Sequence, residues 1–251
     1  MTIDHPAACH IPKLRLLWKK AFGDTDAFLD VFFSTGYDAS RCRCIQEDED
    51  MAAALYWFDM TCSGQKFAYI YAVATDPDFR GRGLCRMLMD DTAAVLKAQG
   101  YDGAILVPQD AGLRIMYGKM GYLPATTLEE AHCAASVPCS VEEISVEDYA
   151  CRRKSCLPAG GMLPEQAALD FLSKLARFYA GEGFLAAVSR EEEHLRILEY
   201  LGDRSVASAL VAALGHREAT LRTVGAGMEF AMYLPLTDRC CMPEYFPFAF
   251  D

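Results

Sequence analysis

Residues 69–122 read YIYAVATDPDFRGRGLCRMLMDDTAAVLKAQGYDGAILVPQDAGLRIMYGKMGY, and this stretch contains most of the pattern that determines the fold. Its first part continues a run rich in aromatic and β-branched residues, which predicts a strand over residues 66–75. The apolar spacing then changes to that of an amphipathic helix, which begins at Leu84 and ends at Gly100. A short apolar segment, residues 103–107, predicts a strand buried on both faces. This order predicts two parallel strands joined by a helical crossover.

The preceding sequence predicts the rest of a mixed sheet with helices on its faces. Two apolar stripes at helical spacing come first, and strands with a tight turn at Ser63 and Gly64 follow them. The expected elements are helices over residues 13–22 and 25–36, strands over 42–46 and 52–60, and a short helix over 111–120. We therefore predict the fold class α/β (α+β), with a mostly antiparallel central sheet flanked by helices.

The second half predicts a smaller lobe in which the order of elements resembles that of the first. After a connection over residues 129–141, the expected elements are a helix over 165–179, strands over 184–189 and 195–201 around a polar turn at 191–193, a helix over 204–214, and strands over 219–224 and 230–234. The two halves share no repeat of individual residues. We predict two domains, residues 1–135 and residues 136–251.

Composition excludes several classes of protein. The 251 residues are 52% hydrophobic and 24% charged, which is typical of a globular chain and not of a disordered one. Apolar runs fall well short of the ~20 residues that cross a bilayer, and the N-terminus lacks the pattern of an export signal, so we expect a cytoplasmic protein. The net charge of −11 disfavours nucleic-acid and membrane partners and slightly favours a cationic one. The same charge is also typical of proteins that are acidic for solubility alone.

The eleven cysteines do not predict a metal site. Their number is odd, no Cys-x-x-Cys pair occurs, and no pair of histidines lies at ligand spacing. We interpret them as small buried apolar residues in a reducing compartment.

The turn Arg80-Gly81-Arg82-Gly83 carries the first chemical signal. It lies between the predicted strand and helix, where unpaired backbone N–H groups and the positive end of the helix point outward. Glycines allow a ligand to approach the backbone, and two arginines suit a pyrophosphate. Taken alone, a Gly-x-Gly turn with two arginines is a weak signal, and an ordinary solvated turn is the first interpretation.

Residues 69–122 resemble the acetyl-CoA-binding core of the GNAT superfamily of N-acetyltransferases. That family carries Gln/Arg-x-x-Gly-x-Gly/Ala and, some thirty residues later, a Tyr four residues before Gly-Phe or Gly-Tyr. Residues 78–83 correspond to the first motif, and Tyr117 with Gly121 and Tyr122 to the second. The resemblance extends over about residues 10–125. Asp78 and Asp110 depart from it, because the family usually has Gln or Arg, and often Asn, at these positions.

The resemblance implies acetyl-CoA as the acyl donor and assigns residues to it. The pantetheine arm would lie along the strand at Val73 and Thr75, in the manner of an added strand. The pyrophosphate would bind the turn and the first helical residues: Arg80, Gly81, Arg82, Gly83, Leu84 and Cys85. Tyr117 matches the acid that protonates the departing thiolate. A tyrosine simply packed on a helix face is the alternative for Tyr117.

The general base stays open. Asp59, Glu47 or a water held by backbone groups are candidates, although an acidic run is often only a solvated turn. The carboxylate at the C-terminus, Asp251, is another, because the aromatic tail looks similar to those of multidomain GNAT enzymes of the enhanced-intracellular-survival type. The alternative is that this tail packs on the core.

In the second half, the strand-to-helix turn at residues 201–205 contains Asp203, which opposes an anion. We therefore expect a degenerate GNAT-like lobe that binds no cofactor and walls the substrate cleft. The sequence predicts an N-acetyltransferase that acts on a primary amine of a small, cationic acceptor. The alternatives are a non-catalytic acyl-CoA-binding or sensor module and a structural protein with two inert lobes.

Overall fold

The computed structural model describes residues 1–190 and 194–250, and these form two compact units. The first comprises residues 1–123, 164–171 and 232–241, and the second residues 124–163, 172–231 and 242–251. The chain thus contributes two late segments to the first unit, so the division is not a single cut near residue 135. No helix in the described residues is long and apolar enough to cross a membrane.

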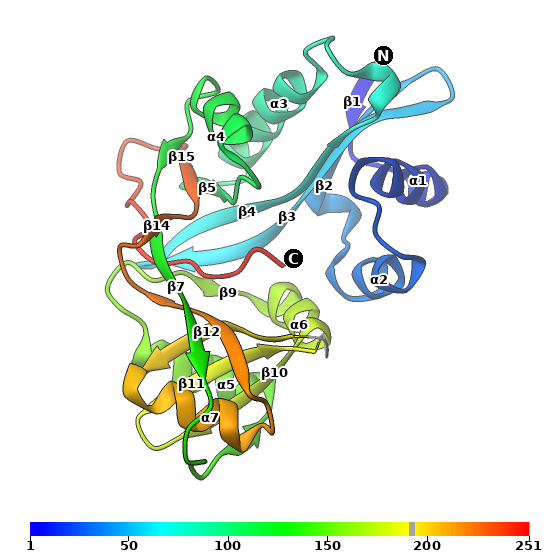
Figure 1. Ribbon diagram of the computed structural model, residues 1–251. Coiled ribbons are helices and arrows are strands. Elements are labelled where there is room, and N and C mark those ends of the chain that lie inside the picture. The colour runs from blue at the N-terminus through cyan, green and yellow to red at the C-terminus, as the bar shows by residue number, and fades with distance from the viewer. Residues whose placement is uncertain (191–193, 251) are drawn as a thin grey trace. The chain divides into compact units, whose positions relative to one another are not determined.

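A mixed sheet forms the centre of the first unit (Figure 1). Its strand order is β1 (Thr2–Asp4), β2 (Cys42–Glu47), β3 (Asp50–Cys62), β4 (Gln65–Thr75), β5 (Gly103–Leu106), β15 (Met232–Pro235) and β6 (Leu123–Pro124), and β9 (Leu163–Pro164) pairs with β3. The β4–β5 pair is parallel and is joined through helix α3 (Leu84–Ala98), as predicted. The other pairs whose register is defined are antiparallel.

Helices cover both faces of this sheet, and β3 is therefore buried on both sides. Leu55 and Trp57 pack with α3 and with α4 (Ala111–Gly118). Tyr56 and Phe58 point to the opposite face, towards an aromatic cluster with α1 (Ile11–Phe22), α2 (Asp26–Val31) and the π-helical turn η2 (Phe32–Gly36). The helix predicted over 25–36 therefore ends early and continues as a wider turn.

A second sheet forms the centre of the other unit (Figure 1). Its order is β14 (Met228–Glu229), β7 (Thr127–Ala134), β13 (Glu218–Val224), β12 (Leu195–Gly202), β11 (Phe184–Ser189), β10 (Ala176–Gly181) and β8 (Glu142–Ile144). Helix α7 (Ala207–Ala213) follows the short turn η5 (Arg204–Val206), and helices α5 (Val146–Cys156) and α6 (Gln166–Leu175) precede β10. The β12–β13 pair is parallel and is connected through α7, which repeats the strand–helix–strand unit of the first sheet.

Three predictions of elements were wrong. The helix expected to reach residue 179 ends at Leu175, and residues 176–181 form β10, whose aromatic residues fit a strand as well as a helix stripe. The connection expected over 129–141 contains most of β7, a strand whose Glu and Ala residues have low β propensity. The strand expected over 230–234 is β15, and it pairs with β5 in the first unit. The polar turn expected at 191–193 lies outside the described residues.

Candidate active site

Strand β4 leaves part of its backbone edge unpaired. In the described residues its parallel ladder with β5 ends at Tyr69 and Ile105, although β4 continues to Thr75. The register with β3 also shifts opposite Ala72, whose φ of +49° marks a β-bulge. Val73 and Thr75 lie in this second half of β4 and are half-buried. Backbone groups on this edge are therefore available to an extended ligand. No signal in the sequence predicted the bulge.

Glycines shape the turn between β4 and α3. Gly81 and Gly83 have φ values of +77° and +78°, in the left-handed region that favours glycine. Gly83 is the N-cap of α3, and no described side chain caps this helix. The N–H of Met87 donates to the Gly83 carbonyl at 3.1 Å, so the N–H groups in the first turn precede the helical ladder. These donors and the positive end of the helix meet at the predicted phosphate site.

Both arginines of the turn already have partners in the protein. Arg80 Nε donates to the Thr75 carbonyl at 3.3 Å. Arg82 Nη2 donates to both carboxylate oxygens of Glu47, at 2.7 and 3.0 Å, and its guanidinium lies over the Phe79 ring. Glu47 was a candidate base, and the structure places it against the predicted phosphate-binding arginine instead. An anion on the turn would compete with Glu47 for Arg82.

Asp76 anchors the start of the same turn. Its carboxylate accepts from the Asp78 backbone N–H at 3.1 Å and from Lys20 Nζ at 2.8 Å. Burial acts to raise the pKa of Asp76, but these two donors outweigh it and the net pKa is lowered. Asp78, which departs from the family motif, therefore contributes its backbone to the cap that holds the turn.

Tyr117 is buried near the start of α3. It belongs to α4, where the carboxylate of Asp110 accepts from the Leu113 N–H at 2.8 Å and caps the helix. Asp110 is thus the N-cap residue of α4, at the position where the family often has Asn. The Tyr117 side chain is 6% exposed, and burial raises its pKa, with a further contribution from the nearby Cys85 thiol. The hydroxyl therefore stays protonated at neutral pH and can serve as an acid.

Asp59 is fully engaged by its neighbours. It lies within β3, three residues before the end of the strand. One carboxylate oxygen accepts from the Tyr101 hydroxyl and the other from Arg41 Nη1 at 3.1 Å. The Tyr101 hydroxyl in turn accepts from Trp57 Nε1 at 3.1 Å. As a base, Asp59 would have to break these contacts.

The C-terminal tail is packed in the second unit over its described length. Tyr245, Phe246, Phe248 and Phe250 are all 4% exposed or less. Asp251, whose carboxylate was a candidate base, lies outside the described residues.

The turn before α7 has its own internal partners. The Asp203 side chain accepts from the Ser205 backbone N–H at 2.9 Å. Arg204 donates to both oxygens of Glu129, at 2.7 and 2.8 Å. The prediction that this lobe binds no cofactor stays a prediction, and the negative charge of Asp203 at this turn is its physical basis.

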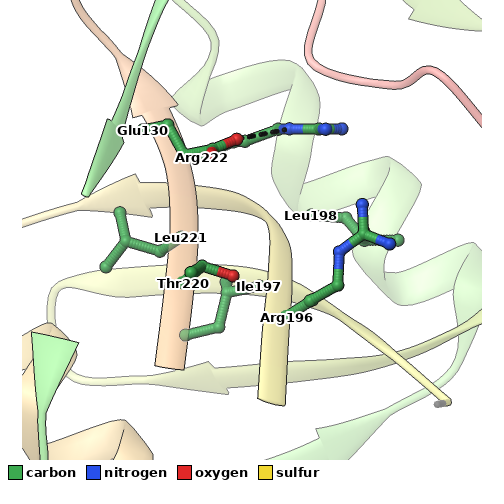
Figure 2. Close-up of a pocket in the computed structure, with 7 residues that line it drawn as sticks. All are labelled: Glu130, Arg196, Ile197, Leu198, Thr220, Leu221 and Arg222. Atoms are coloured by element: carbon green, nitrogen blue, oxygen red, sulfur yellow. Dashed lines mark hydrogen bonds and ion pairs between the residues drawn. The ribbon is translucent and has the colours of Figure 1, made fainter. Parts of the chain in front are cut away.

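A small pocket on the second sheet also contains arginines (Figure 2). Arg196 and Arg222 extend from the neighbouring strands β12 and β13, and Glu130 of β7 pairs with Arg222 at 3.3 Å. The pocket volume is about 10 Å³, which suits a single water molecule. An acyl-CoA does not fit there.

Comparisons with known proteins agree with the fold and with the motifs of the first unit. Residues 3–125 match the family model of the acetyltransferase (GNAT) domain. A crystal structure of a GCN5-related N-acetyltransferase from Kribbella flavida is 13% identical, with a TM-score of 0.70 over 94% of this chain and 72% of that one. Another, from Anabaena variabilis, is 14% identical, with a TM-score of 0.72 over 94% and 73% of the two chains.

Eis1 from Mycobacterium abscessus has the same fold, at 12% identity and a TM-score of 0.67 over 94% of this chain and 74% of that one. A search of curated protein sequences finds no significant match. The family match over residues 3–125 contains the open edge of β4, the glycine turn and Tyr117. Residues 3–125 therefore form a domain of the GNAT acetyltransferase family, and the protein is an acyltransferase.

Proposed function

We propose that the protein transfers the acetyl group of acetyl-CoA to a primary amine of a small, cationic acceptor. One observation carries the proposal: the open edge of β4 leads directly into an uncapped helix N-terminus. An extended pantetheine amide chain requires such an edge, and a pyrophosphate requires such a helix end.

Each part of the donor has a counterpart in the first unit. The pantetheine amides would pair with backbone groups at Val73 and Thr75. The pyrophosphate would accept from the N–H groups of Gly81, Arg82, Gly83, Leu84 and Cys85, with the side chains of Arg80 and Arg82 as further donors. Arg82 would then exchange Glu47 for a phosphate.

The chemical step needs an acid for the departing thiolate and a base for the proton of the amine. The amine nitrogen attacks the carbonyl carbon, the C–S bond breaks, and the thiolate takes a proton. We assign that proton to the Tyr117 hydroxyl, since burial keeps it protonated. The proton of the amine leaves through a base, for which Asp59 and Glu47 would each have to give up an arginine partner. A water held by backbone groups has no such cost.

Net charge is the only support for the acceptor class. The net charge of −11 favours the approach of a cation over that of an anion. The alternative, a module that binds acyl-CoA without turnover, would need the β4 edge and the glycine turn but no acid at residue 117.

Calorimetric titration of the fully reduced protein with acetyl-CoA tests the donor site. We expect one equivalent to bind per chain. Mass spectrometry of a panel of amines incubated with protein and acetyl-CoA then tests for acetylated products. Absence of binding at millimolar acetyl-CoA would refute the proposal, and binding without any acetylated amine would favour the sensor.

A further inference from the structure

Two cysteines that have no part in acyl transfer lie next to each other in the first unit. Cys62 is the last residue of β3, and Cys241 follows β15, 179 residues later in the chain. The Cys241 thiol donates to the Cys62 carbonyl oxygen at 3.6 Å. Burial raises the pKa of the Cys62 thiol, and the adjacent Cys241 thiol raises it further. The two sulfur-bearing side chains therefore share one site.

The Gln65 side chain holds this pair together independently of the sulfur atoms. Gln65 pairs with Cys62 across the hairpin of β3 and β4. The Gln65 side chain accepts from the Cys241 N–H at 2.7 Å and donates to the Arg239 carbonyl at 2.7 Å. Both cysteines are thus fixed to the same end of one hairpin. A disulfide requires this kind of preset approach, because it forms without strain only between closely placed Cα atoms.

The hairpin end is a tight turn. Ser63 and Gly64, which connect Cys62 to Gln65, have φ values of +50° and +77°. Two consecutive positive values are typical of a type I′ turn, which matches the twist of the flanking strands.

The neighbouring Cys240 has a different orientation. Its sulfur lies against Gly103, 2.8 Å from where a Cβ would stand, and its thiol donates to the Cys241 carbonyl at 3.4 Å. Cys241 is half-buried whereas Cys62 is buried, so Cys241 is the thiol that an oxidant reaches first. Cys240 provides a matched control at the adjacent position.

We propose that Cys62 and Cys241 form a disulfide when the protein meets a peroxide. The Cys241 thiol first loses its proton, and the thiolate attacks one peroxide oxygen as the O–O bond breaks. The hydroxide that leaves takes up that proton, so a sulfenic acid and one water result. The Cys62 sulfur then attacks the sulfenic sulfur, the S–S bond forms, and the S–O bond breaks. The leaving hydroxide takes the Cys62 proton and becomes the second water. Two thiols lose two electrons, and one peroxide becomes two waters.

The bond would link the hairpin of β3 and β4 to the segment that follows β15. Closing a loop of 179 residues restricts the unfolded chain strongly. We expect oxidation to raise Tm by about 5 °C or more, and dithiothreitol to reverse the rise.

Peptide mapping under non-reducing conditions tests the pairing. The full chain is treated with one to two equivalents of hydrogen peroxide, the remaining thiols are blocked with N-ethylmaleimide, and the digest is analysed by mass spectrometry. We expect a linked peptide that contains Cys62 in the wild type and in Cys240→Ser, and its loss in Cys241→Ser. The rise in Tm on oxidation should follow the same pattern.

Persistence of the linked peptide in Cys241→Ser, or its absence from Cys240→Ser, would overturn the assignment. Circular dichroism and the Tm of the reduced variants show whether the serine substitutions leave the protein folded. The inference does not depend on the proposed function, since the link can form whether or not the protein acetylates an amine.

Discussion

Substitution of Gly83 by Glu should weaken acetyl-CoA binding about 100-fold with little loss of fold. Nothing lies within 4 Å of a Cβ at residue 83, so a side chain meets no steric clash. Its φ of +78° imposes a backbone strain of about 1–2 kcal/mol on any L-residue. Gly83→Ala carries the same strain without the charge and is the matched control.

The charge sets the size of the effect on binding. A carboxylate at residue 83 would lie about 6 Å from a pyrophosphate bound at the turn, where each pair of unit charges costs about 1.4 kcal/mol at an effective dielectric constant of about 40. Two phosphate charges give about 2.8 kcal/mol, which is about 100-fold in Kd. In the free protein the same carboxylate faces the positive end of α3, which offsets about 0.3–1 kcal/mol of the strain.

Calorimetric titration of reduced wild type, Gly83→Ala and Gly83→Glu measures this difference directly, and urea unfolding measures the strain. We expect the two variants to have similar stability and a Kd for acetyl-CoA that differs by about 100-fold. Equal affinity in the two variants would show that the phosphates do not bind at this turn, and the assignment of the first helical turn of α3 would then fail.

Other expectations follow from the same contacts. Tyr117→Phe should lower kcat about 100-fold or more and leave the Kd for acetyl-CoA unchanged. Product formation measures kcat, and calorimetry measures Kd. An unchanged kcat would exclude the acid role. Glu47→Gln should tighten acetyl-CoA binding a few-fold because it releases Arg82, whereas a role as the base requires a large fall in kcat at saturating substrate. Glu199→Gln should destabilise the protein by about 3–5 kcal/mol in urea unfolding, because it leaves the buried Arg153 without its carboxylate, while Glu142→Gln in an exposed pair should be nearly neutral. The lowered pKa of Asp76 means that its contribution to stability is present above the unfolded pKa of about 4 and is lost as the pH falls through the lower native pKa. The stability difference between wild type and Asp76→Asn should therefore shrink as the pH falls below about 4.

Local signals predicted the first unit well because residues that favour helix ends and turns lie where its elements begin and end. Gly23 ends α1 in the left-handed conformation, and Thr25 caps α2 through its side chain, as its residue type indicates. The parallel pairing of β4 and β5 followed from the length of the helix between them. These features depend on residues that are close together along the chain, so the sequence alone is enough to predict them.

The pairing of β15 could not be predicted in this way. Residues 232–235 pair with Ala104 and its neighbours in β5, more than a hundred residues earlier. The sequence of an apolar strand does not indicate which strand it pairs with. Residues 230–234 follow the elements of the second lobe along the chain, and we therefore expected them to belong to it. The sequence also could not predict the ion pairs of Glu47 with Arg82 and of Asp59 with Arg41, since both depend on tertiary packing.

The two strand-to-helix turns of the molecule illustrate how few residues separate a candidate anion site from an inert turn. Both follow a strand whose next strand in the chain is its parallel neighbour, so the topology is the same. Before α3, glycine at the N-cap leaves the helix end without a side-chain cap. Before α7, Asp203 accepts from the turn's own N–H, and its negative charge stands where a phosphate would have to bind. The fold supplies the position in both lobes, and the two turns differ in sequence, with Gly83 at the N-cap of α3 and Asp203 in the short turn that precedes α7.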